Sequence, residues 1–123
     1  MVLIVYDSKT GNVKRFIGKL NKLDCVQITD GLIVDEPFVL VTYTTGFGQV
    51  PASTAQFLDR CGYLMRAVAA SGNRNWGARY GLAADQVAAH YQVPILMKFE
   101  LSGTSRDVER FYQEVNNHVY AAV

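Results

Sequence analysis

The chain has 123 residues, half of them hydrophobic, which is enough for one domain with a single core and too few for two. Lysine and arginine outnumber acidic residues by one, and no basic run or acidic tail is present, so no long-range field favours nucleic acid. No basic leader opens the chain, and no apolar run reaches membrane-spanning length. We expect residues 1–123 to form one soluble, cytoplasmic domain with no membrane or nucleic-acid partner.

The cysteines and histidines do not form a recognisable metal site. Cys25 and Cys61 are far apart and make no CxxC pair, and the only histidines are His90 and His118. No set with metal-ligand spacing results. The sequence therefore predicts two buried free thiols and no bound metal.

An apolar run over residues 2–6 opens the chain and predicts a strand that is covered on both faces. It stops at a polar turn in which Ser8, Thr10 and Asn12 supply short hydrogen-bonding side chains. Gly11 lets backbone amides approach a ligand at the positive end of the following helix. These features suggest a site for a phosphate ester.

The same polar cluster is also how an ordinary strand-to-helix turn caps its helix, and the residues alone leave both interpretations open. The turn lacks the Gly-Lys-Ser/Thr ending of a nucleoside triphosphate loop. It also lacks the three spaced glycines of a dinucleotide site. If the turn binds a ligand, the phosphate of a mononucleotide is the candidate that is left after these two exclusions.

Apolar residues recur at helical spacing over residues 12–23, which predicts an amphipathic helix on one face of a sheet. Residues 25–28 suggest a short strand near an edge, followed by a turn at Asp30 and Gly31. Residues 38–43 form a second continuous apolar run, which predicts a central strand. The loop after it places two glycines around Phe47, a combination that allows unusual backbone angles beside a planar surface.

The second half of the chain repeats this alternation. A helix capped by Ser53 or Thr54 is expected to end near Gly62, and a fourth strand lies within residues 63–71. A polar loop over residues 72–77, bounded by glycines, then carries Trp76, the only tryptophan.

A helix over residues 78–91 is expected to bury Leu82, Val87 and Tyr91, and a fifth strand is expected within residues 93–101. Thr104 and Asp107 fit a capping box before the last helix. The buried stripe of that helix is predicted to be Val108, Phe111, Tyr112, Val115 and Val119.

Alternating strands and helices predict a mainly parallel sheet with helices on both faces, in which ligands lie beyond the carboxyl ends of the strands. Three loops with candidate binding residues follow strands, so we expect them to converge at the carboxyl edge of the sheet. A phosphate-binding turn facing Phe47 and Trp76 suits a flat aromatic ring with a phosphate tail. Flavin mononucleotide (FMN) fits this description.

Several motifs together resemble the NrdI family of small flavodoxin-like proteins over nearly the whole chain. They are DSKTGNV at residues 7–13, VTYTT at 41–45, FGQVPAST at 47–54, AASGN at 69–73, WG at 76–77, YQVPI at 91–95 and KFELSGT at 98–104. The resemblance implies an α/β flavodoxin-like fold, doubly wound, with a five-stranded parallel sheet in the order 2-1-3-4-5.

The resemblance also implies a function with class Ib ribonucleotide reductase. Reduced FMN would react with O2, and the resulting oxidant would pass to the dimanganese site of the small, radical-bearing subunit to support tyrosyl radical formation. A separate electron donor would reduce the flavin. The protein would then be a redox-active accessory rather than a stand-alone enzyme, with the chemistry carried by the flavin and no catalytic side chain.

By the same resemblance, three groups of residues bind the cofactor. The residues that bind the phosphate are Ser8, Lys9, Thr10, Gly11, Asn12 and Val13. For Lys9 the alternative is a solvated surface position without a ligand contact. The ring is bordered on one side by Thr44, Thr45, Gly46, Phe47 and Gly48. The other side is formed by Gly72, Asn73, Trp76 and Gly77.

Some of these positions keep an alternative role. Trp76 could be a packing residue, and Asp7 could brace the turn or touch the ligand. Electron-carrying flavodoxins usually have Thr or Ser where Val13 stands, so one hydroxyl contact is absent. We expect residues 102–104 to be peripheral.

Two other functions compete with this interpretation. A general electron-carrier flavodoxin is disfavoured because such carriers tend to be strongly acidic, whereas this chain is nearly neutral. A flavin-free receiver or interaction module would gather acidic residues at the strand ends. The third and fourth predicted strands end instead at Thr44 and Ser71.

Overall fold

The computed structural model describes residues 2–46 and 48–120, without the side chain of Tyr120. Its strands are β1 (Leu3–Tyr6), β2 (Cys25–Gln27), β3 (Phe38–Tyr43), β4 (Met65–Gly72) and β5 (Ile95–Glu100). Its α-helices are α1 (Asn12–Ile17), α2 (Ala52–Cys61), α3 (Leu82–Tyr91) and α4 (Ser105–Val115). Shorter helical turns are η1 (Gly62–Leu64), η2 (Arg74–Arg79) and the π-helical η3 (Asn116–Tyr120).

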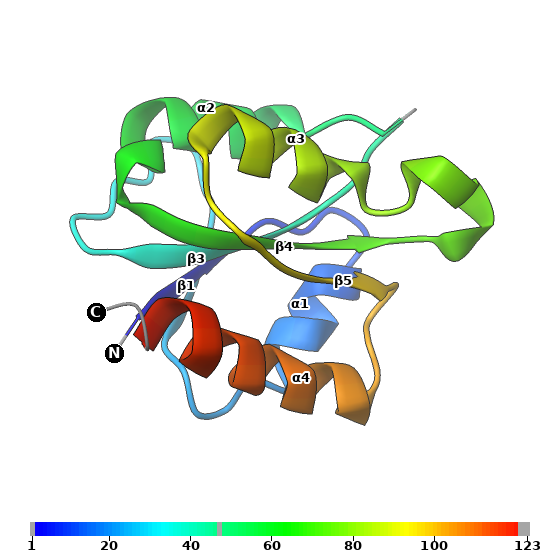
Figure 1. The fold of residues 1–123 in the computed structure, drawn as a ribbon. Helices are drawn as coiled ribbons and strands as arrows, with labels where there is room; N and C mark the ends of the chain where they lie inside the picture. Colours follow the sequence, from blue (N-terminus) through cyan, green and yellow to red (C-terminus); the bar gives the residue numbers. More distant parts are fainter. Residues whose placement is uncertain (1, 47, 121–123) are drawn as a thin grey trace.

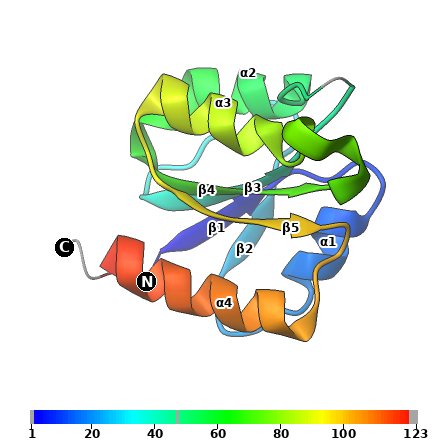
Figure 2. The ribbon, with the colours of Figure 1, turned by 45° about the vertical axis from the view of Figure 1, so that its right-hand side comes forward.

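The five strands form one parallel sheet in the order β2-β1-β3-β4-β5. Helices α2 and α3 cover one face of this sheet, while α1 and α4 cover the other (Figures 1 and 2). This confirms the predicted class, the strand order and the edge position of β2. Because every paired neighbour is parallel, the carboxyl ends of the strands share one edge of the sheet.

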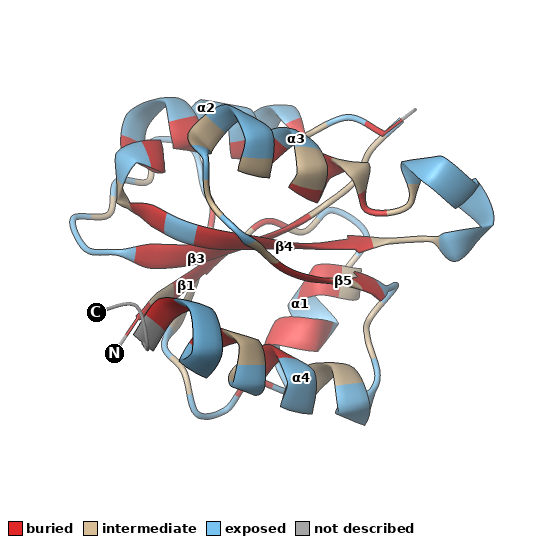
Figure 3. Ribbon diagram, in the orientation of Figure 1, coloured by how far each residue is buried: buried red, intermediate tan, exposed pale blue. Residues whose placement is uncertain are grey.

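Both faces of the sheet are buried, as the unbroken apolar runs predicted (Figure 3). In β1, Ile4 packs in the cluster that includes Phe16 and Phe111, whereas Val5 packs in the cluster that includes Phe57. All of these side chains are fully buried. Successive residues of a strand point to opposite faces, so one strand contributes to both halves of the core.

Aromatic rings fix α1 and α4 against the sheet. The ring of Phe16 stacks on Phe99 of β5 with centroids 4.0 Å apart and meets Phe111 of α4 edge-on at 5.6 Å. Such pairs contribute about 0.5–1.5 kcal/mol each beyond the burial of their area. The predicted stripe of the last helix is partly confirmed, since Phe111, Val115 and Val119 are buried while Val108 and Tyr112 are only half-buried.

The first helix is shorter than the predicted span of residues 12–23. After Ile17 the chain tightens into a turn in which the amides of Lys19 and Leu20 donate to the carbonyls of Phe16 and Ile17, three residues back. Gly18 stands at the break, and glycine is about 1 kcal/mol less favourable than alanine inside a helix. Leu20 still reaches the core, at 2% exposure, so the apolar spacing predicted burial correctly but not the helix end.

The third helix begins at Leu82, not at residue 78. Gly77, with φ 58° and ψ −121°, has a backbone conformation that no α-helix contains. Small residues make the closest contact with the sheet, because Ala83 and Ala84 are buried whereas Leu82 and Tyr91 are only partly so. The prediction was right for Val87.

Two capping predictions have opposite outcomes. At α4 the capping box is confirmed, because the Asp107 amide donates to Thr104 Oγ1 at 3.2 Å and the Thr104 amide donates to Asp107 Oδ2 at 2.7 Å. At α2 the prediction was wrong: Pro51 precedes the helix, and Ser53 and Thr54 lie inside its first turn. Their hydroxyls have another partner, described below.

Both cysteines are free thiols, but only Cys61 is buried. Cys25 lies on the edge strand β2 and is half-buried, so the prediction of two buried thiols was right for one. Burial, with a smaller effect of neighbouring Asp24, raises the pKa of the Cys25 thiol to about 11. A thiol with such a pKa stays protonated, and therefore weakly nucleophilic, at neutral pH.

Candidate functional site

A pocket of about 340 Å³ opens where β1, β3 and β4 end, within the size range of small-molecule sites. The residues that line it lie at the carboxyl ends of β3 and β4, in the loops after the strands and at the start of α1. They are Ser8, Lys9, Thr10, Asn12, Val13, Tyr43, Thr44, Thr45, Gly46, Ser71, Gly72, Asn73, Trp76, Arg79, Gly81 and Leu101.

The structure brings together most of the residues that the sequence predicted for a cofactor site. Three predicted glycines, Gly11, Gly48 and Gly77, do not line the pocket and instead shape the loops beside it. Phe47 lies outside the described residues. His90 and His118 are not among the lining residues either.

Five lining residues were missed. Tyr43 and Ser71 lie near the carboxyl ends of β3 and β4, and Leu101 follows β5, so the strand-end rule could have found them. Arg79 and Gly81 lie on the return from η2 to α3, and no local pattern in the sequence marks them.

The loop between β1 and α1 both caps the helix and lines the pocket. Ser8 lines the pocket, and its Oγ also accepts the backbone N–H of Lys14 at 3.2 Å, which caps the helix from outside. Gly11 adopts φ 93°, in the left-handed region that favours glycine. The Ser8 hydroxyl therefore caps α1 without leaving the pocket wall.

Asp7 braces the turn. Its carboxylate is buried, at 6% exposure, and Oδ2 accepts hydrogen bonds from the hydroxyls of Ser53 and Thr54 in the first turn of α2. The Thr54 hydroxyl also lies 2.9 Å from that of Thr42 on β3. These hydrogen bonds, buried at Asp7, Thr42 and Thr54, join the end of β1 to β3 and α2.

Tyr43 links the brace to the pocket electrostatically. Burial, and then the negative charge of Asp7, raise the pKa of the Tyr43 phenol above its usual value. Both causes disfavour the phenolate. Tyr43 therefore presents a neutral hydroxyl-bearing ring to the pocket at physiological pH.

The loop after β3 turns tightly and packs against α3. The amides of Gly48 and Gln49 both donate to the Thr45 carbonyl, at 3.2 and 2.7 Å. Gly48 has φ 98°, and a Cβ there would lie 2.6 Å from Leu82 Cδ2. The positive φ favours glycine at this position, and the small residue lets the loop pack closely against the Leu82 side chain.

The loop after β4 carries Trp76, whose side chain is 48% exposed and lines the pocket instead of packing in the core. Asn73 begins η2 and accepts the Asn75 amide at 2.9 Å. A Cβ on Gly72 would lie 2.8 Å from the backbone nitrogen of Gly81, so the two ends of this loop touch. The loop is thereby closed at its base while Trp76 remains accessible.

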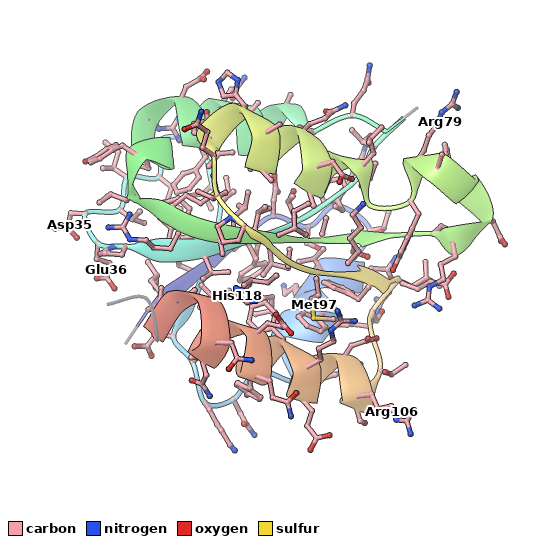
Figure 4. All side chains as sticks on the ribbon, viewed as in Figure 1. Asp35, Glu36, Arg79, Met97, Arg106 and His118 are labelled. Atoms are coloured by element: carbon pink, nitrogen blue, oxygen red, sulfur yellow. The ribbon has the colours of Figure 1, made fainter. Side chains whose placement is uncertain are left out.

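The charged side chains that line the described pocket, Lys9 and Arg79, are both positive. Figure 4 shows Arg79 at one end of the molecule and Asp35 and Glu36 at the other. Hydroxyls, an amide and Lys9 in the turn after β1, with the indole and Arg79 in η2, suit an anionic group attached to an aromatic ring.

Comparison with known proteins identifies the family. The model of the family described as NrdI flavodoxin-like matches residues 4–113. A curated relative, protein NrdI of Bacillus licheniformis, is 53% identical over 119 residues, covering 97% of this chain and 91% of the relative.

Solved structures share the fold. A short-chain flavodoxin associated with a non-canonical PDU bacterial microcompartment superposes with a TM-score of 0.76 at 19% identity, over 99% of this chain and 98% of that one. A Fusobacterium nucleatum flavodoxin bound to flavin mononucleotide superposes with a TM-score of 0.62 at 14% identity, over 94% of this chain and 95% of that one.

Among residues 2–46 and 48–120, no helix is both long enough and apolar enough to cross a bilayer. The fold and the family together imply a flavin cofactor. The chain belongs to the NrdI family of flavodoxin-like proteins.

Proposed function

We propose that the pocket binds FMN and that the protein supports class Ib ribonucleotide reductase. The observation that carries the proposal is the pocket at the strand ends, which joins a polar, cationic turn to the exposed indole of Trp76. One of the solved structures with this fold holds FMN, and the family name links the chain to the reductase.

The phosphate is assigned to residues 8–13. Ser8, Thr10 and Asn12 offer side-chain hydrogen bonds, and Lys9 adds a positive charge at the rim. Because α1 has only six residues, its dipole adds little, and the loop amides with these side chains hold most of the phosphate charge. Val13 has no side-chain hydroxyl to offer the phosphate, which also leaves more of the binding to the loop amides.

The ring is assigned to the space between residues 44–46 and the loop of residues 72–77. Trp76 supplies an apolar surface for stacking, while Thr44, Thr45 and Gly46 border the edge of the ring. Tyr43 is a neutral phenol at physiological pH, and burial with the charge of Asp7 raises its pKa further, so it places no charge beside the ring.

When bound, reduced FMN supplies the reaction with O2 that gives the oxidant used at the dimanganese site of the small reductase subunit. The protein side chains have no acid–base role in this scheme. They hold and orient the cofactor, and the half-exposed Trp76 leaves one side of the site open to O2, to an electron donor and to the partner subunit.

The first test is reconstitution. Protein mixed with FMN and then desalted is expected to keep a flavin spectrum that is shifted from that of free FMN. If no flavin is retained, both the activator function and the electron-carrier alternative fail.

The second test separates those two functions. The reduced, FMN-loaded protein is mixed with O2 and the manganese-loaded small subunit, and the tyrosyl radical is measured by electron paramagnetic resonance. We expect a radical with this protein and none with an ordinary flavodoxin under the same conditions. Flavin retention without a radical would favour the general electron carrier.

A further inference from the structure

Arg15 joins the polar turn after β1 to the loop after β5. Its Nη2 donates to Asn12 Oδ1 at 2.6 Å, and its Nε donates to Ser102 Oγ at 2.9 Å. The Ser102 hydroxyl in turn donates to the same Asn12 Oδ1 at 3.0 Å. The three side chains form a closed triangle of hydrogen bonds, although Ser102 is 87 residues from Arg15 in the sequence.

This triangle fixes which way the Asn12 amide faces. A guanidinium has donors only, so the amide atom that faces Arg15 must be the oxygen. The Ser102 hydroxyl accepts from Arg15 and therefore also offers its proton to that oxygen. With Oδ1 engaged twice, the NH2 group of Asn12 is turned away from Arg15 and Ser102, and Asn12 lines the pocket.

The loop that carries Ser102 is held against α1 by further contacts. Lys19 Nζ donates to the carbonyls of Ser102 and Gly103 at 3.3 and 3.1 Å. A Cβ on Gly103 would lie 2.7 Å from Phe16 Cδ1, so the glycine lets the loop close over that ring. The loop that carries Ser102 is thus held by the Phe16 ring of α1 and by Lys19 just after that helix.

We propose that Arg15 and Ser102 are positioning residues that lock the Asn12 amide with its NH2 group toward the pocket, so that the site selects a phosphomonoester over the uncharged alcohol. The inference rests on the proposed function, because it concerns the phosphate end of the same site. Arg15 is not among the lining residues and acts through Asn12.

The chemistry follows from the two faces of an amide. Phosphate oxygens are acceptors only, so they gain from N–H donors and are repelled by a carbonyl oxygen. Without the triangle, the Asn12 amide could rotate and present its oxygen, since the two ends of the group have nearly the same shape. Loss of orientation therefore weakens the binding of FMN and leaves riboflavin, which lacks the phosphate, unaffected.

The test is a double-mutant cycle with FMN and riboflavin as ligands and flavin fluorescence as the readout. Arg15→Met and Asn12→Ala are each expected to weaken FMN binding about tenfold, the scale of one hydrogen bond to a charged group. The double variant is expected to bind FMN no more weakly than Asn12→Ala alone. Riboflavin affinity is expected to stay within about twofold in all variants, which also shows that each one is folded.

Lys19→Met is the matched control, because it removes an equal charge and a contact to the same loop but touches no atom of Asn12. It is expected to leave FMN affinity within about twofold. Ser102→Ala keeps all charges and is expected to weaken FMN binding in the same direction as Arg15→Met.

Two outcomes would overturn the inference while leaving the proposed function intact. In one, Arg15→Met weakens binding further in the Asn12→Ala background, which means that Arg15 acts on the phosphate directly or by charge. In the other, Lys19→Met weakens binding as much as Arg15→Met. Wild-type protein that binds no FMN would instead refute the proposed function itself.

Discussion

Trp76 is the residue whose exposure is hardest to explain by packing. Its ring is 48% exposed in a loop that contributes no buried residue. We expect Trp76→Ala to weaken FMN binding by roughly 1–3 kcal/mol, the scale of burying and stacking a large aromatic ring. The free energy of unfolding without ligand should change by no more than about 0.5 kcal/mol.

Flavin fluorescence titration and urea unfolding measure the two quantities separately. Tyr63→Ala is the matched control, because Tyr63 is 77% exposed in η1, which precedes β4 and so lies at the opposite end of that strand. That variant should keep the affinity of the wild type. A stability loss at Trp76 with unchanged affinity would make the tryptophan a packing residue.

Asp7 and Tyr43 make an electrostatic prediction within the site. Burial is the first cause of the raised pKa of Tyr43 and the charge of Asp7 is the second. Asp7→Asn removes only the second cause, so the pKa of Tyr43 should fall but stay above its ordinary value of 10.0. Nuclear magnetic resonance of ring-labelled tyrosine against pH measures this shift.

A second carboxylate–tyrosine pair provides the control. Burial and then Asp59 raise the pKa of Tyr91, so Asp59→Asn should lower the pKa of Tyr91 and leave that of Tyr43 unchanged. The sign for stability also follows. Because the pKa of Tyr43 is raised in the folded state, the unfolded phenol loses its proton first as pH rises above 10.0, and the free energy of unfolding then falls. The part of that fall due to Tyr43 should be smaller in Asp7→Asn, where the pKa of the folded phenol is raised less.

At the scale of elements, substitutions at two glycines distinguish the effect of steric crowding on stability from the effect of backbone strain. Gly72 ends β4 at the pocket, and a Cβ there would lie 2.8 Å from the backbone nitrogen of Gly81, which cannot move aside. Gly31 has φ 76° with nothing within 4 Å of an added Cβ. We expect Gly72→Ala to lower the free energy of unfolding by about 1–3 kcal/mol through overpacking, and to weaken FMN binding.

Gly31→Ala should lower the free energy of unfolding by about 1 kcal/mol through strain alone and leave FMN affinity unchanged. Urea unfolding and fluorescence titration again give both quantities. If Gly72→Ala lost stability but bound FMN normally, the closed base of the β4–α3 loop would not be needed for the site.

The helices and strands could be predicted from the sequence where neighbouring residues in the chain determine them. The apolar runs of β1 and β3 marked buried strands, and the spacing of Thr104 and Asp107 marked a helix start. Errors arose where tertiary contacts decide. Ser53 and Thr54 were expected to cap α2, but the buried carboxylate of Asp7, 46 residues earlier than Ser53, uses both hydroxyls.

The site shows the same division. Ser8, Thr10 and Asn12 could be predicted to lie in a strand-end turn, because order along the chain and the rule for parallel sheets suffice. The contact of Arg15 with Ser102 could not, because it depends on how α1 and the loop after β5 pack in three dimensions. Residues 102–104 were expected to be peripheral, and none of them lines the pocket, whereas Leu101 just before them does.

At the scale of the molecule, the strand order places the pocket across the centre of the sheet. The loops after β1 and β3, neighbouring strands, form its first two walls, and the loop after β4 forms the third. Hydrogen bonds join these walls, since the Thr44 amide donates to the Ser71 carbonyl at 3.2 Å and Ser71 Oγ donates to the Leu101 carbonyl at 2.6 Å. A ligand that contacts all the walls therefore stabilises the folded chain as a whole.

This linkage makes a prediction about thermal unfolding. A ligand that binds only the folded state at 100 times its Kd adds about 2.7 kcal/mol to the free energy of unfolding, which for a chain of this size raises Tm by roughly 10 °C. FMN should produce such a rise in a calorimetric scan. Riboflavin at the same concentration should produce a smaller one, because residues 8–13 have no phosphate to bind. Equal rises with both ligands would mean that the polar turn caps α1 and binds no phosphate.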